Sequence, residues 1–97
     1  MKVLFLHPAE IELDDAFEYY QSIMDGLGHR FIKEVSYSIN RIKNFPSAYP
    51  TIGKASRRCL VKNFPYGLIY QEQENYILIV AVSNIHRKPA YWFSRES

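Results

Sequence analysis

Residues 76–92 read YILIVAVSNIHRKPAYW, and the first half of this stretch decides the fold. Residues 76–83 are apolar at nearly every position, so both alternating sets of side chains are suited to burial. Such a run is typical of a strand inside a sheet that is covered on both faces. The second half changes to histidine, arginine, lysine and aromatic residues. The central strand is therefore predicted to lead directly into a group of functional side chains.

Two further strands are predicted upstream, at residues 58–62 and 66–71. The connections between the three strands are short and rich in turn-forming residues, which indicates an antiparallel meander. Residues 46–56, which precede the first of these strands, are rich in Pro, Ser, Thr and Gly and have no apolar period. We interpret them as a surface loop.

The N-terminal half predicts a short strand at residues 2–6 and then two helices, because apolar residues recur at three- and four-residue spacing. The first helix follows His7-Pro8 and ends before Gly26-Leu27-Gly28, and the second covers residues 29–45 and ends before Pro46. A connection this short predicts an antiparallel helical hairpin.

The prediction is an α+β fold that forms a single domain over residues 1–97, since a chain of 97 residues can bury one core. It consists of an N-terminal strand, an antiparallel two-helix hairpin and a three-stranded antiparallel meander. Because the chain should reverse direction at each connection, we expect the first strand to be antiparallel to its neighbour. The result would be an all-antiparallel, four-stranded sheet with the helices on one face.

The formal net charge of +2 is unevenly distributed, with −2 over residues 1–53 and +4 over residues 54–97. The basic half could form a face that binds a polyanion, although scattered surface charge is the usual outcome at this net charge. The one cysteine, Cys59, has no partner for an internal disulfide, which fits a reducing compartment. The apolar run at residues 3–6 is too short for a signal peptide or a membrane span, so we expect a cytoplasmic protein.

A set of residues spread over the chain, together with the order of the elements, follows one known pattern. Its members are Ala9, Leu13, Tyr19-Tyr20, Gly26-Leu27-Gly28, Phe31, Pro46, Tyr49-Pro50, Arg57-Arg58, Phe64-Pro65-Tyr66, Tyr70, Ala81-Val82, Arg87, Pro89 and Tyr91-Trp92. In these residues the chain resembles the RelE/ParE family of type II toxin–antitoxin toxins. It departs from the family at Asn84, where relatives often carry a histidine three residues before the arginine, and it has a histidine at His86 instead.

The resemblance implies a growth-inhibiting toxin whose partner is a cognate antitoxin, with which it would form a hetero-oligomer. RelE-like members cut messenger RNA on the ribosome, whereas ParE-like members poison DNA gyrase. We expect ribosome-dependent mRNA cleavage. Gyrase poisoning and a degenerate toxin that only binds its antitoxin are the alternatives. No membrane partner is expected.

Metal-free RNA cleavage by 2′-hydroxyl attack needs a base, an acid and cations that hold the phosphate. The residues expected to be catalytic are His86, Arg87, Arg58 and Tyr91. The residues expected to bind phosphate or RNA are Lys54, Arg57, Lys62 and Lys88. No metal and no cofactor are expected.

Each of these assignments has a structural alternative. His86 could simply cap the end of a strand, and Tyr91 and Trp92 could pack the C-terminal segment onto the core. Arg57 and Arg58 should point to opposite faces of their strand, so at least one of them should face away from the helices. If the target is gyrase, His86 and Tyr91 would be dispensable, because poisoning by protein binding needs no acid–base pair.

Overall fold

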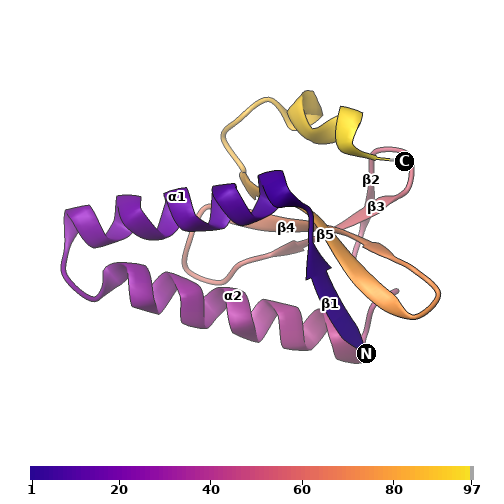
Figure 1. The fold of residues 1–97 in the computed structure, drawn as a ribbon, viewed down its shortest axis with the longest axis horizontal. Coiled ribbons are helices and arrows are strands. Elements are labelled where there is room, and N and C mark those ends of the chain that lie inside the picture. Colours follow the sequence, from indigo (N-terminus) through magenta and orange to yellow (C-terminus); the bar gives the residue numbers. More distant parts are fainter. Residues whose placement is uncertain (97) are drawn as a thin grey trace.

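The computed structural model describes residues 1–96, which form eight elements (Figure 1). In chain order they are β1 (Lys2–Phe5), α1 (His7–Ile23), α2 (Leu27–Asn44), β2 (Thr51–Ile52), β3 (Ser56–Leu60), β4 (Tyr66–Glu72), β5 (Tyr76–Asn84) and the 3-10 helix η1 (Pro89–Arg95). Figure 1 shows α1 and α2 as a long antiparallel hairpin, as predicted, and places the C-terminal end beside β2 and β3. None of the helices in residues 1–96 is long and apolar enough to cross a membrane.

The sheet has five strands in the order β1-β5-β4-β3-β2 and is mixed, so the expected all-antiparallel sheet of four strands was wrong. β1 pairs with β5 in parallel, with Lys2 opposite Tyr76 and Phe5 opposite Ile79. The fifth strand is β2, a two-residue strand inside the predicted surface loop, which pairs antiparallel with β3. The direction of β1 differs from the expectation because the chain does not reverse between β1 and α1: Leu6 bonds to Ile79, and Glu12 of α1 bonds to Val82 further along β5.

The apolar side chains of β5 lie on both faces of the sheet, and a β-bulge shifts their alternation. Ile69 and Tyr70 of β4 pair with Ala81 and Ile79, which leaves Val80 as an extra residue. Ile77, Ile79 and Val82 therefore belong to the core on the helix side, whereas Val80 and Ala81 pack with Ile69 and Trp92 on the other side. The expectation that this strand lies inside the sheet and is covered on both faces is confirmed.

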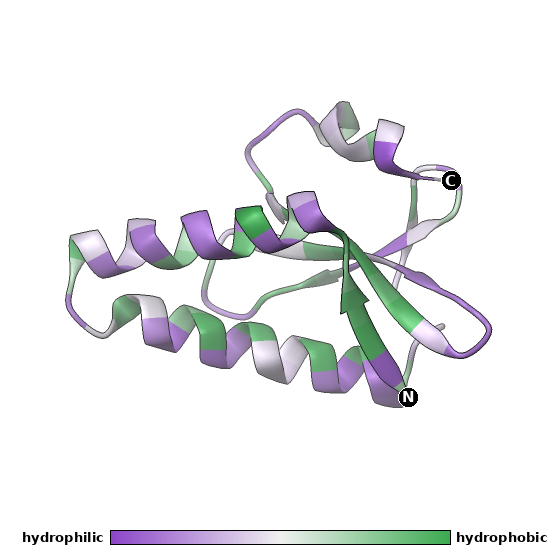
Figure 2. Cartoon of the chain, viewed as in Figure 1, coloured by the Kyte–Doolittle hydropathy of each residue, from purple (hydrophilic) through white to green (hydrophobic). Residues whose placement is uncertain are grey.

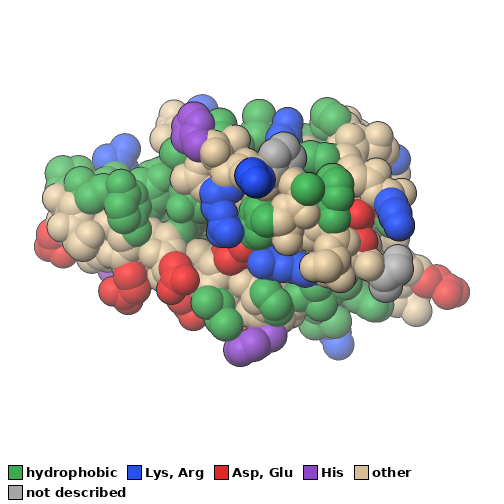
Figure 3. Space-filling view, turned by 90° about the horizontal axis from the view of Figure 1, so that it is seen from above, with side chains coloured by type: hydrophobic (Ala, Val, Ile, Leu, Met, Phe, Trp, Pro, Cys, Tyr) green, Lys and Arg blue, Asp and Glu red, His purple; other side chains and the backbone are tan. Residues whose placement is uncertain are grey.

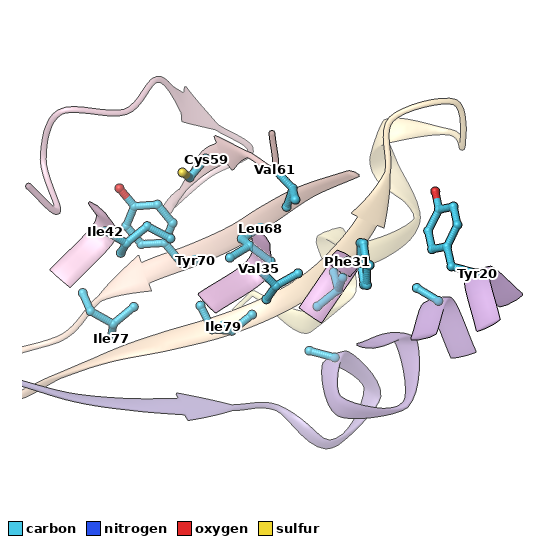
Figure 4. Packing of buried hydrophobic residues seen from close by; sticks show 13 residues of the cluster. Tyr20, Phe31, Val35, Ile42, Cys59, Val61, Leu68, Tyr70, Ile77 and Ile79 are labelled. Carbon is cyan, nitrogen blue, oxygen red and sulfur yellow. The ribbon is translucent and has the colours of Figure 1, made fainter. Parts of the chain in front are cut away.

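The main core lies between the helical hairpin and the sheet. Figure 4 shows Val35 of α2, Leu68 of β4 and Ile79 of β5 together in this layer. An aromatic group at the other end of the layer joins the two helices to the turn before β4, with the ring of Phe31 5.2 Å from that of Phe64. Figure 2 shows hydrophobic residues along β1 and β5, whereas the helices alternate between hydrophobic and hydrophilic positions.

Candidate functional site

Arg58 and Arg87 line the same depression on the face of the sheet opposite the helical hairpin. Arg58 is opposite Ile69, whose side chain lies on the η1 side of the sheet, and Arg87 lies just beyond the end of β5. Both arginines line a small depression of about 40 Å³. The other residues around it are Ile52, Ile69, Ser83, Asn84 and Ile85. Of the two adjacent arginines of β3, Arg58 is therefore the one that shares a depression with Arg87.

Arg57 points to the opposite face and has a local structural contact. It is opposite Tyr70, which belongs to the helix-side core, and its Nη1 donates a hydrogen bond to the Tyr49 carbonyl oxygen at 2.7 Å. This bond holds the segment before β2 against β3. Arg57 was expected to bind phosphate, but its guanidinium group lies on the other side of the sheet from the depression.

The three candidate lysines are exposed and lie apart from one another. Lys54 is in the turn between β2 and β3, Lys62 follows the far end of β3, and Lys88 immediately precedes η1. Figure 3 looks onto the η1 side, where Lys and Arg side chains are spread over several places and form no single continuous patch. The fold gathers two of the predicted cations and leaves the others as separate surface charges.

His86 and Tyr91 occupy different environments. His86 is exposed in the turn after β5, where its backbone N–H donates to Asn84 Oδ1 at 2.9 Å. Asn84, at the position where relatives often have histidine, thus stabilises this turn. The Tyr91 hydroxyl donates to Glu12 Oε2 at 2.7 Å, and burial raises the pKa of this phenol. The guanidinium carbon of Arg87 lies 3.9 Å from the centre of the Tyr91 ring.

Glu12 of α1 is a site residue that the sequence prediction missed. Its carboxylate accepts hydrogen bonds from the Val82 N–H at 3.0 Å, from Tyr91, and from both terminal nitrogens of Arg95 at 2.8 and 3.1 Å. The side chains of Glu12 and Arg95 are only 14% and 18% exposed. The sequence did contain one indication that Glu12 is partly buried: its spacing places it on the same helix face as Ala9 and Ala16, which are buried.

A second depression, of about 260 Å³, lies between α1 and the end of β5. It is lined by Glu12, Asp15, Ala16, Tyr19, Tyr66, Val82, Asn84 and Arg87. Asn84 and Arg87 line both depressions, so Arg87 separates an acidic surface on α1 from the cationic surface at Arg58. Within residues 1–96, no three His, Cys, Asp or Glu side chains are grouped so that they could hold a metal ion.

Comparison with known proteins gives a matching family and solved structures with the same fold. The model of the family described as ParE toxin of type II toxin-antitoxin system, parDE, matches residues 3–89. A solved structure from the chromosomal ParDE TA system of P. aeruginosa superposes with a TM-score of 0.69 at 12% identity. The superposition covers 87% of this chain and 95% of that chain, so it supports a common fold. No curated protein matches the chain.

Proposed function

Because the chain belongs to the ParE toxin family of type II toxin–antitoxin systems, we propose that it arrests growth by binding DNA gyrase in the cytoplasm and that a cognate antitoxin neutralises it. The toxin would be a binding protein rather than a nuclease. This proposal replaces the mRNA cleavage expected from the sequence, because the matching family is that of the gyrase-directed branch.

The observation that carries the proposal is the composition of the depression between Arg58 and Arg87. Its other lining residues are apolar or uncharged, so it contains two cations but no acid or base that could move a proton. Among residues 1–96, His86 lines neither depression, and the Tyr91 hydroxyl is hydrogen-bonded to Glu12. Cleavage of RNA without a metal requires an acid and a base within reach of the same phosphate. Recognition of a carboxylate or phosphate requires only the two guanidinium groups.

The same two arginines provide a contact for the antitoxin. Among the residues that the structure describes, neither makes an ion pair, so both can accept an acidic side chain from a partner. A bound antitoxin segment with a carboxylate here would neutralise the surface that the target needs. This gives a physical reason why one partner would exclude the other.

The proposal is tested by measuring gyrase–DNA cleavage complexes with purified toxin and gyrase. We expect the wild-type toxin to trap double-strand breaks and Arg58→Ala/Arg87→Ala to lose at least about tenfold in potency, since two charge-assisted contacts are removed. The matched control is Lys33→Ala/Lys43→Ala, which removes the same charge from α2 and should trap breaks as the wild type does.

A parallel experiment tests the alternative that the toxin is a nuclease. Primer extension on a reporter message after toxin induction should show no codon-phased cuts, and His86→Ala should arrest growth as the wild type does. Codon-phased cuts that disappear in His86→Ala, without trapped gyrase breaks, would overturn the proposal.

A further inference from the structure

The backbone of β5 has an unpaired edge where β1 ends. The last contact of the N-terminal segment with this edge is the hydrogen bond from the Leu6 N–H to the Ile79 carbonyl oxygen at 3.0 Å, after which the chain turns into α1. The Val82 N–H, further along the same edge, therefore has no strand opposite it. The Glu12 carboxylate takes the place of that strand and accepts this hydrogen bond at 3.0 Å.

The same carboxylate holds the C-terminal segment. Arg95 binds it through both terminal nitrogens and also donates from Nη1 to the Val80 carbonyl oxygen at 3.2 Å. Tyr91 donates its hydroxyl to the second carboxylate oxygen at 2.7 Å. Glu12 thus joins α1, β5 and η1 at one point, and its partners Val82 and Tyr91 lie 70 and 79 positions away from it in the sequence.

Tyr91, which was expected from the sequence to be dispensable for gyrase poisoning, links this point to Arg87. The Arg87 guanidinium carbon lies 3.9 Å from the centre of the Tyr91 ring, and that of Arg95 lies 5.2 Å from it. An exposed arginine has several rotamers of similar energy, and stacking on an aromatic face selects among them. The orientation of the Tyr91 ring, set by Glu12 and Arg95, therefore sets the direction of the Arg87 guanidinium group.

We propose that Glu12 is a positioning residue of the toxin: through Tyr91 it fixes Arg87 beside Arg58 in the geometry that binds the target. The inference rests on the proposed function, because it assigns Arg87 to the binding surface. Glu12 itself does not line the depression that contains both arginines. In this proposal its effect on the arginine pair passes through Tyr91 and Arg87.

A double-mutant cycle tests this route. Glu12→Gln keeps the size of the side chain and one acceptor oxygen but removes the charge that holds Arg95 and Tyr91. We expect it to raise the toxin concentration for half-maximal trapping of gyrase breaks about tenfold in the wild-type background and less than about twofold in an Arg87→Ala background. The matched control is Glu10→Gln, an exposed carboxylate of the same helix, which should have no effect in either background. Equal losses in both backgrounds would mean that Glu12 acts only on stability and would overturn the inference.

Tyr91→Phe is a second variant for the same cycle and can be used if Glu12→Gln fails to fold. It removes only the hydroxyl contact with Glu12 and leaves the ion pair with Arg95. We expect a loss of about threefold that is absent in the Arg87→Ala background. No loss in the wild-type background would contradict the proposed route.

A spectroscopic measurement separates this inference from the proposed target. The side-chain protons of Arg87 should show an upfield ring-current shift from Tyr91 in the wild type and lose it in Glu12→Gln. If the wild type traps no gyrase breaks, the proposed function fails. The double-mutant cycle of Glu12→Gln and Arg87→Ala is then measured with growth arrest as the readout. If the ring-current shift persists unchanged in Glu12→Gln, the positioning role is wrong whatever the target.

Discussion

Arg57 and Arg58 are adjacent in the chain but have different tasks, because successive side chains of a strand point to opposite faces of the sheet. Arg57 donates to the Tyr49 carbonyl oxygen and fixes the segment before β2. Arg58 lies beside Arg87 on the η1 side and is free of ion pairs among residues 1–96. The proposed recognition of a partner therefore depends on Arg58, whereas replacing Arg57 should mainly loosen the local structure.

Gly53, in the turn between β2 and β3, is a residue whose replacement should lower stability. Its φ is 69°, and a Cβ atom there would lie 2.7 Å from Glu96 Oε1 and 3.0 Å from Trp92 Cη2. We expect Gly53→Ala to lower the free energy of unfolding by about 2 kcal/mol or more, from left-handed backbone strain plus displacement of these neighbours. Urea denaturation measures the loss.

Gly26 provides the matched control for this prediction. Its φ is 89°, but a Cβ atom there would meet nothing within 4 Å. Gly26→Ala should therefore lose only the strain, about 1 kcal/mol. Equal losses for the two variants would show that the contacts with Glu96 and Trp92 do not matter.

Among the elements, η1 is held to the sheet at both of its ends by carboxylates. Near its start, Tyr91 binds Glu12, and just past its end Glu96 accepts hydrogen bonds from the Lys54 N–H at 3.1 Å, the Ala55 N–H at 2.9 Å and Ser56 Oγ at 2.6 Å. Between them Trp92 is 1% exposed. The element thus covers the apolar outer face of β4 and β5, and its attachment depends on ionised carboxylates.

The attachment through Glu96 should weaken in acid. Burial alone would raise the pKa of this carboxyl, but the hydrogen bonds from Ser56, Ala55 and Lys54 lower it below its ordinary value of 4.5. A carboxyl group whose pKa is lower in the folded state than in the unfolded state stabilises the fold above pH 4.5. This contribution is lost as the pH falls through the pKa of the folded state. Acidification should therefore loosen the end of η1.

Trp92, the only tryptophan of the chain, reports this change. Its fluorescence emission should shift to longer wavelength as the pH is lowered from about 6 to about 3. In Glu96→Gln this step should be absent, because the substituted side chain does not titrate. Glu74→Gln, in the exposed turn before β5, should keep the wild-type profile. An unchanged profile in Glu96→Gln would assign the acid step to another group.

For the whole molecule, the helical hairpin and the sheet form one unit because an aromatic group joins them. The ring of Phe31 lies 5.3 Å from that of Tyr20, 5.2 Å from Phe64 and 5.1 Å from Tyr66. These four residues come from both helices, from the turn before β4 and from β4 itself. We therefore expect cooperative unfolding of the hairpin together with the sheet.

Phe31→Ala should lower the free energy of unfolding by about 3–5 kcal/mol, because Phe31 is fully buried and its loss leaves a cavity. Phe93→Ala, at a position that is 43% exposed on η1, should cost less than about 1 kcal/mol. Circular dichroism of the helices and Trp92 fluorescence should give the same midpoint in urea for each variant. Two separate transitions would contradict a single cooperative unit.

The sequence by itself determined the elements that have long, regular patterns. The helical hairpin follows from apolar spacing and β5 from its continuous apolar run, and the resemblance to RelE/ParE toxins identified the wider family. Only the tertiary structure decided the direction of β1 relative to β5, since the apolar spacing of α1 does not show that the helix continues along the sheet in the direction of β1. It also decided that Arg58 rather than Arg57 meets Arg87, and that Glu12 binds Arg95, 83 positions away. Local patterns fix local conformation, whereas strand direction, register and side-chain partners depend on contacts between segments that are distant in the chain.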